Sequence, residues 1–378
     1  MKICFWGDMS GALKGRTRGG GELQVALIAK ALVKGGHEVV VLDYVIAEEF
    51  QTCDGIKVYP VKGWNDGIRI LRSFTHRFPT LYKCLKEQKA DVYYCRIRDF
   101  RHIIVWLAAR KVKAKFILAL AEDLDVMTFG MRLKYDYLSF LHSPWGFFSG
   151  ILNEFVYPFL IRKSDAVFVQ HEGQKQMLFQ KGIKSILLPN LIDFTQLPVI
   201  PKPTHDYFIY VGRLAKRKGV DEFLKIVEKT PFEKFIVVGQ ARNKSGYFYY
   251  DKLKTFQNVS LLGQLKHSET LQHIAYSKAL ISTSPMEGFP NIFIEAWAQG
   301  IPVISLRVDP GSIIEREKLG EFAHGDLERL LQSINNYKYS DEFAERAKYY
   351  VVNNHLLNDT KIEEISGLFR DLVSPEKS

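Results

Sequence analysis

Short, almost continuously apolar segments alternate with amphipathic segments along the first half of the chain. Residues 2–7 and 37–43, the latter containing Val39-Val40-Val41-Leu42, have the pattern of buried strands. Residues 21–34 repeat apolar side chains at helical spacing and predict a helix between these strands. Strands that are apolar on both faces are typical of parallel sheets covered by helices. Further strands are predicted at residues 56–61, 91–97, 115–120 and 166–170.

The second half of the chain repeats this alternation, with strands predicted at 207–211, 235–238, 259–262, 279–283 and 302–305. A proline-rich stretch containing Pro198, Pro201 and Pro203 separates the halves. We therefore expect an α/β protein with two doubly wound, Rossmann-like domains. Ligands of such folds bind at the carboxyl ends of the strands, which predicts a site in a cleft between the domains. The expected boundaries are 1–190 for the first domain, 191–205 for a linker, 206–355 for the second domain and 356–378 for a C-terminal helix returning to the first domain.

The composition is that of a globular protein. Of the 378 residues, 47% are hydrophobic and 13% aromatic, which requires buried cores and excludes a disordered or low-complexity chain. The four cysteines, none in a CxxC pair, are expected to be reduced thiols. Apolar stretches such as residues 103–109 fall far short of the ~20 residues that cross a bilayer, so we expect a soluble or peripheral, cytoplasmic protein.

Positive charge is concentrated in the first half. Residues 1–200 contain 28 Lys and Arg against 19 Asp and Glu, or +9, whereas residues 201–378 contain 24 against 23, or +1. Residues 57–115 alone hold 15 basic and four acidic side chains. Such a surplus indicates either an anionic partner, such as a membrane, a nucleic acid or a charged glycan, or simply a solvated face. The sequence contains no recognisable nucleic-acid-binding module, which makes a nucleic acid the weakest of these partners.

Two glutamates stand eight positions apart in the segment Ser284-Pro-Met-Glu-Gly-Phe-Pro-Asn-Ile-Phe-Ile-Glu295. Pro290 suits the first turn of a helix, which places Glu287 in the preceding loop and Glu295 more than one turn inside. The backbone amides of residues 288–291 then form a helix N-terminus, which attracts phosphate. A carboxylate, an anion site and a second carboxylate match a sugar, a diphosphate and a ribose.

A basic turn, Val211-Gly-Arg-Leu-Ala-Lys-Arg-Lys-Gly219, follows the first strand of the second half. Arg213 and Lys218 would stand at the mouth of the sheet, where two cations stabilise the charge on a departing phosphate without a metal. A basic loop of this kind is often only solvated. Its occurrence together with the glutamate pair favours the functional interpretation.

These motifs resemble the donor-binding domain of retaining GT-B glycosyltransferases of family four. The resemblance covers Tyr210-Val-Gly-Arg213 with Lys218, Val237-Val-Gly239, the Leu262-Gly263 turn, the E-x7-E pair and Glu295-Ala-Trp-Ala-Gln-Gly-Ile-Pro-Val-Ile304, over about 100 residues. Pro189-Asn-Leu-Ile-Asp193 resembles the stretch that leads into the family's linker.

The resemblance implies a role for each matched residue. Arg213 and Lys218 would hold the donor diphosphate, Glu287 the donor sugar and Glu295 the ribose. Gly212, Gly288, Phe289, Pro290 and Asn291 would line the sugar and phosphates, and Gly263 and Leu265 would meet the base.

In the first half, Gly19-Gly-Gly-Glu22 resembles the family's glycine-rich loop, so that Gly19 and Gly20 would approach the donor phosphate, with glycine permitting a positive φ. After residues 115–120 the chain departs from the family, because many relatives have a histidine where this chain reads Ala121-Glu-Asp-Leu-Asp125. Either Glu122 or Asp123 would replace that histidine in positioning a sugar. Asp123-x-Asp125 also resembles a metal-binding pair of another glycosyltransferase fold, but the motifs as a whole indicate an enzyme without a metal or other cofactor.

The sequence thus predicts an enzyme that transfers a sugar, with retention, from a nucleotide sugar, with uridine as the expected base. The acceptor would be a glycan or lipid-linked molecule of cell-surface polysaccharide or glycolipid synthesis. The basic region, the cationic amphipathic residues 68–78 and the aromatic residues 131–161 favour docking on an anionic membrane, at the inner face of the plasma membrane. Residues 68–78 are also consistent with an ordinary surface helix, and residues 131–161 with the wall of an acceptor pocket or with a helical segment packed on its own domain. The alternatives are a sugar-nucleotide epimerase of the same fold and a non-catalytic glycan-binding relative.

Overall fold

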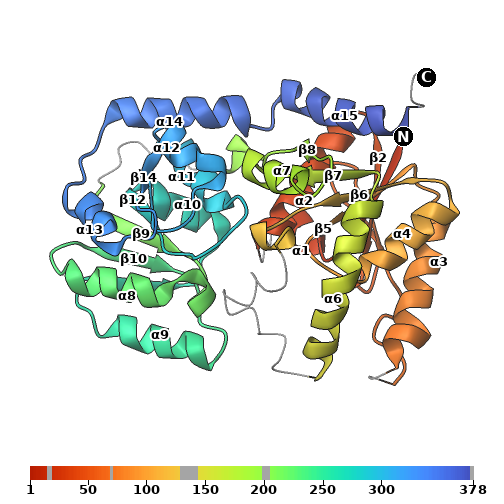
Figure 1. Cartoon of the computed structure of the whole chain (residues 1–378), viewed down its shortest axis with the longest axis horizontal. Coiled ribbons are helices and arrows are strands. Elements are labelled where there is room, and N and C mark those ends of the chain that lie inside the picture. Colours follow the sequence, from red (N-terminus) through yellow and green to blue (C-terminus); the bar gives the residue numbers. More distant parts are fainter. Residues whose placement is uncertain (15–18, 69–70, 128–143, 198–204, 375–378) are drawn as a thin grey trace. The chain divides into compact units, whose positions relative to one another are not determined.

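A computed structural model describes residues 1–14, 19–68, 71–127, 144–197 and 205–374, which form two units (Figure 1). Within the described residues, the first unit comprises residues 1–127, 144–191 and 357–374, and the second comprises residues 192–356. Ile192, Phe194 and Leu197, which the sequence assigns to a linker, belong to the core of the second unit. Residues 198–204, with the linker prolines, lie outside the described residues.

The first unit is built on a sheet with strand order β3-β4-β2-β1-β5-β6-β7-β8, parallel except for the pair β3 and β4. The apolar segments predicted as strands all lie in it, whereas the two-residue strands β3 and β8 are too short for a periodicity to reveal. The strands are β1 Lys2–Trp6, β2 Glu38–Asp43, β3 Phe50–Gln51, β4 Lys57–Pro60, β5 Val92–Arg96, β6 Lys115–Ala119, β7 Ala166–Val169 and β8 Ile186–Leu187.

Helices cover both faces of this sheet. One core lies between the sheet and α2, and a second lies between the sheet and helices α3, α4 and α6. The helical segments are α1 Ser10–Leu13, α2 Gly20–Lys34, η1 Ser73–Arg77, α3 Phe78–Gln88, α4 His102–Lys111, η2 Asp123–Asp125, α6 Pro144–Lys163, α7 Glu172–Phe179 and α15 Asp359–Val373.

Helix α15 follows the second unit in the sequence and completes the first unit's core. Ile362, Ile365 and Phe369 are buried against residues of α2 and the sheet. The approach to α2 is close, because a Cβ atom added at Gly35 would lie 1.8 Å from Oγ of Ser366. The first unit therefore depends on a helix that is separated from its last strand by the whole of the second unit.

The second unit has a fully parallel sheet of order β11-β10-β9-β12-β13-β14. The strands are β9 Tyr207–Val211, β10 Phe235–Val238, β11 Val259–Gly263, β12 Ser277–Ser282, β13 Val303–Ser305 and β14 Gly320–Phe322. The helical segments are η4 Phe194–Gln196, η5 Lys216–Lys218, α8 Val220–Lys229, α9 Lys244–Lys254, α10 His267–Ala275, α11 Asn291–Ala298, η6 Pro310–Ser312, α12 Ile313–Arg316, α13 Leu327–Asn335 and α14 Asp341–Asn354.

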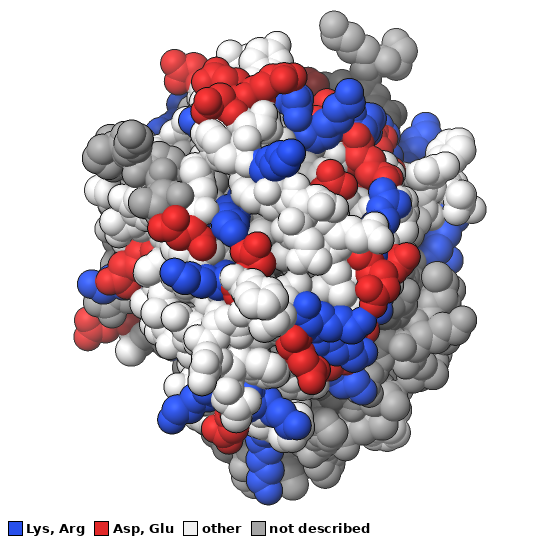
Figure 2. Space-filling model, turned by 90° about the vertical axis from the view of Figure 1, so that its left-hand side faces the viewer, with Lys and Arg blue, Asp and Glu red and all other residues white. Residues whose placement is uncertain are grey.

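The charged surface of the second unit is mixed in sign. In Figure 2, Lys and Arg side chains are interspersed with Asp and Glu over the face that carries α8, α9 and α13. Glu222 illustrates the pattern, because it pairs with both Lys225 and Arg307 at 3.1 Å, and these cations hold the pKa of its carboxyl below the usual value. The near-zero charge of this half is therefore a local pairing of opposite charges.

None of the helices within the described ranges is both long enough and apolar enough to span a bilayer. Helix α6, the longest of the helices in Figure 1, covers most of the aromatic segment predicted from the sequence, and residues 131–143 of that segment lie outside the described residues.

Candidate active site

The basic turn after β9 is anchored by its backbone to the neighbouring strand β12. Tyr210 and Thr283 both donate their hydroxyl hydrogens to the carbonyl oxygen of Lys218, at 3.1 and 3.2 Å. Gly219 has φ +67°, and a Cβ atom there would lie only 1.9 Å from the carbonyl oxygen of Thr283, so only glycine allows this approach. The turn is thereby held against the carboxyl end of β12.

Lys218 and Glu287 form an ion pair across this edge of the sheet, between Nζ and Oε1. Lys218 comes from the turn after β9 and Glu287 from the loop between β12 and α11, so two of the predicted residues are in direct contact. The Lys218 side chain is 24% exposed to solvent, and the Glu287 side chain is 18% exposed. Burial raises the pKa of the neighbouring Tyr210 hydroxyl, and the negative charge of Glu287 raises it further.

Arg213 lies on the same turn as Lys218 and is exposed. Hydrogen bonds join this turn to the ends of β10 and β11. Gly212 donates its N–H to the carbonyl oxygen of Val238 at 2.9 Å, and Gly239 donates its N–H to the carbonyl oxygen of Gly263 at 2.7 Å. A Cβ atom at Gly239 would stand 1.9 Å from the carbonyl oxygen of Gly212. The backbone that carries Arg213 is thus fixed, while its guanidinium faces solvent.

Helix α11 begins directly after the Glu287 loop. Pro290 is its N-cap residue, one position before the helical turn expected from the sequence, and Asn291 is the first helical residue. The ring of Phe289 is buried edge-on against Trp297 and His355 at centroid distances of 6.3 and 5.0 Å. Phe289 therefore anchors the loop with its ring, and the role predicted for residues 288–291 is one for their backbone. The positive end of this helix dipole lies beside Lys218 and Glu287 and favours an anion there.

Glu295 is buried in α11 and pairs with His267, the first residue of α10. His267 Nε2 donates to Glu295 Oε1 at 2.9 Å. This hydrogen bond and the charge of Glu295 raise the pKa of His267, although burial opposes them. The sequence analysis did not identify His267. Its position at the start of a predicted helix, four residues after Gly263, could have pointed to it.

The turn expected to meet a nucleotide base follows β11. Gly263 has φ +69°, and its carbonyl oxygen accepts the N–H of Gly239. Leu265 is partly buried against the core of the second unit. The predicted residues of the second unit thus lie at or beyond the carboxyl ends of strands, and Asn291 and Glu295 lie in the helix that follows β12.

The glycine-rich loop of the first unit leads directly into helix α2. Gly19 is the N-cap of α2 with φ −168°, an extended backbone that any residue adopts, and Gly20 begins the helix. The positive φ that glycine permits is therefore not used at Gly19. A Cβ atom at Gly19 would meet nothing within 4 Å.

The acidic segment after β6 contains two carboxylates with different environments. Asp125 is buried, and its Oδ2 accepts the N–H groups of Ala121 and Glu122 at 2.8 and 3.1 Å. Asp123 instead accepts, on Oδ1, bonds from side chains of the segment after β7, His171 Nε2 at 2.9 Å and Gln174 Nε2 at 3.0 Å. Within the described ranges, no group of three His, Cys, Asp or Glu side chains is arranged to hold a metal ion.

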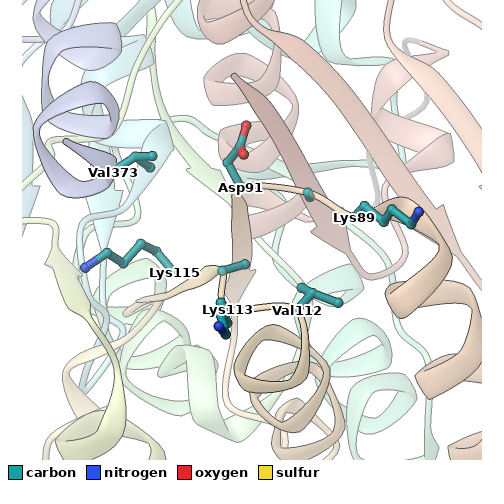
Figure 3. A pocket seen from close by; sticks show the side chains of 8 residues that line it. Lys89, Asp91, Val112, Lys113, Lys115 and Val373 are labelled. Atoms are coloured by element: carbon teal, nitrogen blue, oxygen red, sulfur yellow. The ribbon is translucent and has the colours of Figure 1, made fainter. Parts of the chain in front are cut away.

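A cavity of about 410 Å³ lies at the opposite edge of the first sheet, at the amino ends of β5 and β6 (Figure 3). Lys89, Lys113 and Lys115 line it together with Asp91, whose carboxylate accepts the backbone N–H of Lys2 at 2.7 Å. Parallel α/β sheets bind their ligands at the carboxyl ends of strands. This cavity is therefore remote, within its own unit, from the strand ends that carry the predicted residues.

The fold and these strand-end residues define the class of protein. Two Rossmann-like units with parallel sheets form the GT-B fold of glycosyltransferases. Residues 196–351 of the chain match the family model described as glycosyl transferases group 1.

Three curated relatives show how far the similarity extends. An uncharacterized glycosyltransferase of Methanocaldococcus jannaschii is 27% identical over 39% of this chain and 41% of its own length. A human protein, one of the subunits of phosphatidylinositol N-acetylglucosaminyltransferase, is 22% identical over 77% of this chain and 59% of its own length. The lipopolysaccharide 1,6-galactosyltransferase of Escherichia coli is 25% identical over 86% of this chain and 92% of its own length. The first two matches thus span about half of the relatives' length.

Solved structures establish the fold over the whole chain. Sucrose-phosphate synthase from Thermosynechococcus elongatus is 13% identical with a TM-score of 0.77 and covers 98% of this chain and 99% of its own. HepE from Anabaena, solved with UDP and glucose, is 17% identical with a TM-score of 0.69 and covers 98% of both chains. The UDP-GlcNAc 2-epimerase of Neisseria meningitidis is 14% identical with a TM-score of 0.56 and covers 99% of both.

Proposed function

We propose that this chain transfers a sugar from a UDP-linked sugar to a glycan or lipid-linked acceptor, with retention of the anomeric configuration. The observation that carries the proposal is the contact between Lys218 and Glu287 beside the start of α11. A cation, a carboxylate and a helix N-terminus at one strand edge suit a ligand that has both phosphates and sugar hydroxyls. UDP as the donor nucleotide is supported by the HepE structure that holds UDP and glucose.

In this proposal Lys218 and Arg213 neutralise the diphosphate as it leaves C1 of the sugar. Fixed cations stabilise the growing charge most where water is scarce, and a metal is not required for this role. The sugar acquires oxocarbenium character as the C1–phosphate bond breaks, and the acceptor hydroxyl attacks C1 from the same face. The departing phosphate oxygen takes the hydroxyl proton, so that the products are the glycoside and the protonated nucleoside diphosphate.

The two glutamates divide the remaining donor contacts. Glu287, in the loop, would accept hydrogen bonds from sugar hydroxyls, and Glu295, inside α11, from the ribose. His267 occupies one oxygen of Glu295 and so fixes the orientation of the other. Gly19 and Gly20 would approach the donor phosphates from the start of α2, and at Gly19 an added Cβ atom would meet nothing within 4 Å.

A lipid-linked acceptor is supported by the surface of the first unit and by the names of relatives that act on lipopolysaccharide and phosphatidylinositol. Helices α3, α4 and α6 lie side by side (Figure 1). The segment before α3 and the outer face of α6 expose large apolar side chains: Ile68, Leu71, Phe74, Phe147, Phe148, Ile151, Phe155 and Phe159. Such a patch is unusual on a soluble monomer, and beside the basic surplus it suits an anionic membrane at the cytoplasmic face.

Arg72 and Arg77 of the amphipathic segment are engaged in contacts within the first unit, which limits their contribution to this membrane docking. Arg77 donates from Nε to the carbonyl oxygen of Trp64 at 2.8 Å and from Nη2 to Oδ1 of Asn65 at 3.1 Å. Arg72 donates to the Asn65 carbonyl at 3.3 Å. These side chains fix the loop at residues 64–65, and the apolar side chains supply most of the proposed membrane contact.

The epimerase alternative rests on the fold similarity to the UDP-GlcNAc 2-epimerase, and acceptor chemistry separates the two. The purified protein would be incubated with a panel of UDP-, GDP- and ADP-sugars, with and without a bacterial lipid extract and with and without EDTA. Sugar transfer predicts a heavier acceptor and free nucleoside diphosphate in the presence of EDTA. An epimerised sugar without a labelled acceptor would establish the alternative, and a protein inert towards the whole panel would contradict both.

A further inference from the structure

We propose that Asp123 contacts a hydroxyl group of a sugar substrate at the carboxyl edge of the first unit's sheet, and that His171 and Gln174 position its carboxylate. The proposal rests on the sugar transfer proposed above. It selects Asp123 over Glu122 as the residue that replaces the histidine of related enzymes, and it adds two residues that the sequence motifs do not reveal.

Adjacent strands bring these residues together. Strands β6 and β7 are parallel neighbours with Ala119 opposite Phe168, and the pairing continues as Leu120 donates its N–H to the Phe168 carbonyl at 2.9 Å. The segments that follow the two strands therefore leave the sheet side by side. The first forms the short turn η2, which begins at Asp123, and the second places His171 at the N-cap of α7.

Asp123 receives the hydrogen bonds from both of these side chains on a single oxygen. His171 Nε2 and Gln174 Nε2 donate to Oδ1 at 2.9 and 3.0 Å. A carboxylate in this contact accepts, so His171 carries its proton on Nε2. The two donors restrain the side-chain torsion of Asp123, and they leave Oδ2 for a further donor. The side chain keeps 24% of its exposure, so a ligand can reach it.

Gln174, one of the two donors, is itself held in a buried polar network. Gln174 is fully buried, and its Oε1 accepts the N–H of Gln170 at 2.8 Å. Gln170 donates to Oδ1 of Asn190 at 3.1 Å, and Arg96 donates to the same atom at 2.9 Å. The network thus joins the ends of β5 and β7 with the residues that follow β8. Its members cannot turn away without breaking several bonds, and this makes Asp123 a preorganised acceptor.

His171 is 5% exposed, and its Nδ1 has no hydrogen-bond partner among the described residues. The one polar contact of its ring, within the same described part of the chain, is with Asp123. The arrangement makes sense if the function of His171 is to orient that carboxylate.

The printed contacts of the two neighbouring acids lie within the turn itself. Asp125 points inward and accepts two backbone N–H groups of its own turn, and its burial raises the pKa of its carboxyl. Glu122 precedes the turn, and both its carbonyl oxygen, at 3.0 Å, and its side chain accept the N–H of Asp125. Among the described contacts, Asp123 is the acid whose carboxylate is held by side chains of the neighbouring strand's loop. An oriented carboxylate is suited to a sugar hydroxyl, which donates one hydrogen bond.

The test compares five variants with the wild-type chain in the transfer assay, each first checked by thermal unfolding. Asp123→Asn keeps the shape and removes the charge, and we expect kcat to fall about 100-fold. His171→Ala is expected to lower kcat by roughly 10- to 100-fold through misplacement of Asp123, while the KM for the nucleotide sugar changes less than about threefold. His171→Gln, whose amide can donate to the same oxygen, should recover part of that loss. Glu172→Gln, an exposed neighbour paired only with Lys175 in the described contacts, is the matched control and should leave kcat unchanged.

The KM values also identify the sugar that Asp123 contacts. A larger rise in the acceptor KM for Asp123→Asn indicates the acceptor, and a loss of acceptor-independent hydrolysis of the nucleotide sugar indicates the transferred sugar; either supports the contact. Wild-type activity in Asp123→Asn, or a greater loss in Glu122→Gln than in Asp123→Asn, overturns this proposal alone. A wild-type chain that transfers no sugar overturns the proposed function as well. If His171→Gln is no more active than His171→Ala, the positioning role of His171 is wrong.

Discussion

Replacing Lys218 by Met removes one of the two cations proposed to bind the diphosphate and keeps the alkyl stem of the side chain. Two effects on free energy are expected, and the structure separates them. The first is a loss of transition-state stabilisation of about 3 kcal/mol, the size measured when one charge-stabilising donor is removed, or roughly a 100-fold fall in kcat/KM. The second is a loss of folding stability, because Glu287 keeps its charge at a half-buried position without its partner.

The exposed fractions of 24% and 18% decide the size of the second effect. Exposed ion pairs contribute less than about 1 kcal/mol, and removing one partner of a fully buried pair costs about 3–5 kcal/mol. An intermediate loss of about 1–2 kcal/mol is therefore expected, and Glu287→Gln in the Lys218→Met background should restore most of it because no unpaired charge remains. The same double variant should stay inactive.

The assay is kcat/KM with the preferred nucleotide sugar, alongside thermal unfolding of the two single variants and the double variant. Glu287→Gln alone frees Lys218 from its partner, so binding of the free nucleoside diphosphate should persist or tighten in calorimetry while transfer falls. Glu295→Gln should instead weaken that binding, through the ribose. Near-normal kcat/KM in both Lys218→Met and Arg213→Ala would refute the assignment of the diphosphate site. Recovery of activity in the double variant would refute the separation of the two effects.

Three further predictions concern other parts of the chain. Because the pKa of His267 is raised, its pairing with Glu295 stabilises the fold fully below about pH 6.5, and this contribution is lost as the pH rises through the raised pKa. The unfolding temperatures of wild type and His267→Ala should therefore converge at alkaline pH, and a constant difference would contradict this. The Phe155 side chain on α6 is 75% exposed, and Phe155→Ser should weaken sedimentation of the protein with anionic vesicles. Phe232→Ser, at a side chain 98% exposed in the second unit, is the control and should leave sedimentation unchanged, and equal effects of the two variants would argue against docking through α6. Gly219→Ala should lower the free energy of unfolding by more than about 1 kcal/mol in chemical denaturation, because Gly219 has φ +67° and lies close to the Thr283 carbonyl oxygen. Gly367→Ala in α15, where an added Cβ atom would meet nothing within 4 Å, should be neutral or stabilising, and equal stability of the two variants would refute the steric argument.

The sequence pattern was sufficient for most of the fold because buried parallel strands are apolar on both faces. The predicted strand at 207–211 has the same bounds as β9, and the strands predicted at residues 115–120 and 166–170 each end one residue beyond β6 and β7. Strand β14, Gly320–Phe322, was missed because three residues, one of them charged, carry no periodicity. Its pairing with β13 is a tertiary effect that local sequence does not encode.

The candidate site was only partly predictable for a different reason. Lys218 and Glu287 belong to recognisable motifs, and their contact follows from the adjacency of β9 and β12. His171 and His267 belong to no such motif, since their role follows from a hydrogen bond to a distant carboxylate. Asp123 is 48 positions from His171, and Glu295 is 28 positions from His267. Strand order, which places these loops together, is the information that the sequence pattern lacks.

The return of α15 to the first unit has a consequence for the order in which the protein folds during synthesis. The second unit, residues 192–356 in the described ranges, has all its strands once residue 322 has left the ribosome and its last helix soon after. The first unit still lacks Ile362, Ile365 and Phe369 at that point, so the apolar side chains of α2 that they cover remain open to water. The part of the chain made first is thus completed last, and until α15 emerges it presents an apolar groove of the kind that chaperones bind and that premature termination would leave permanently exposed.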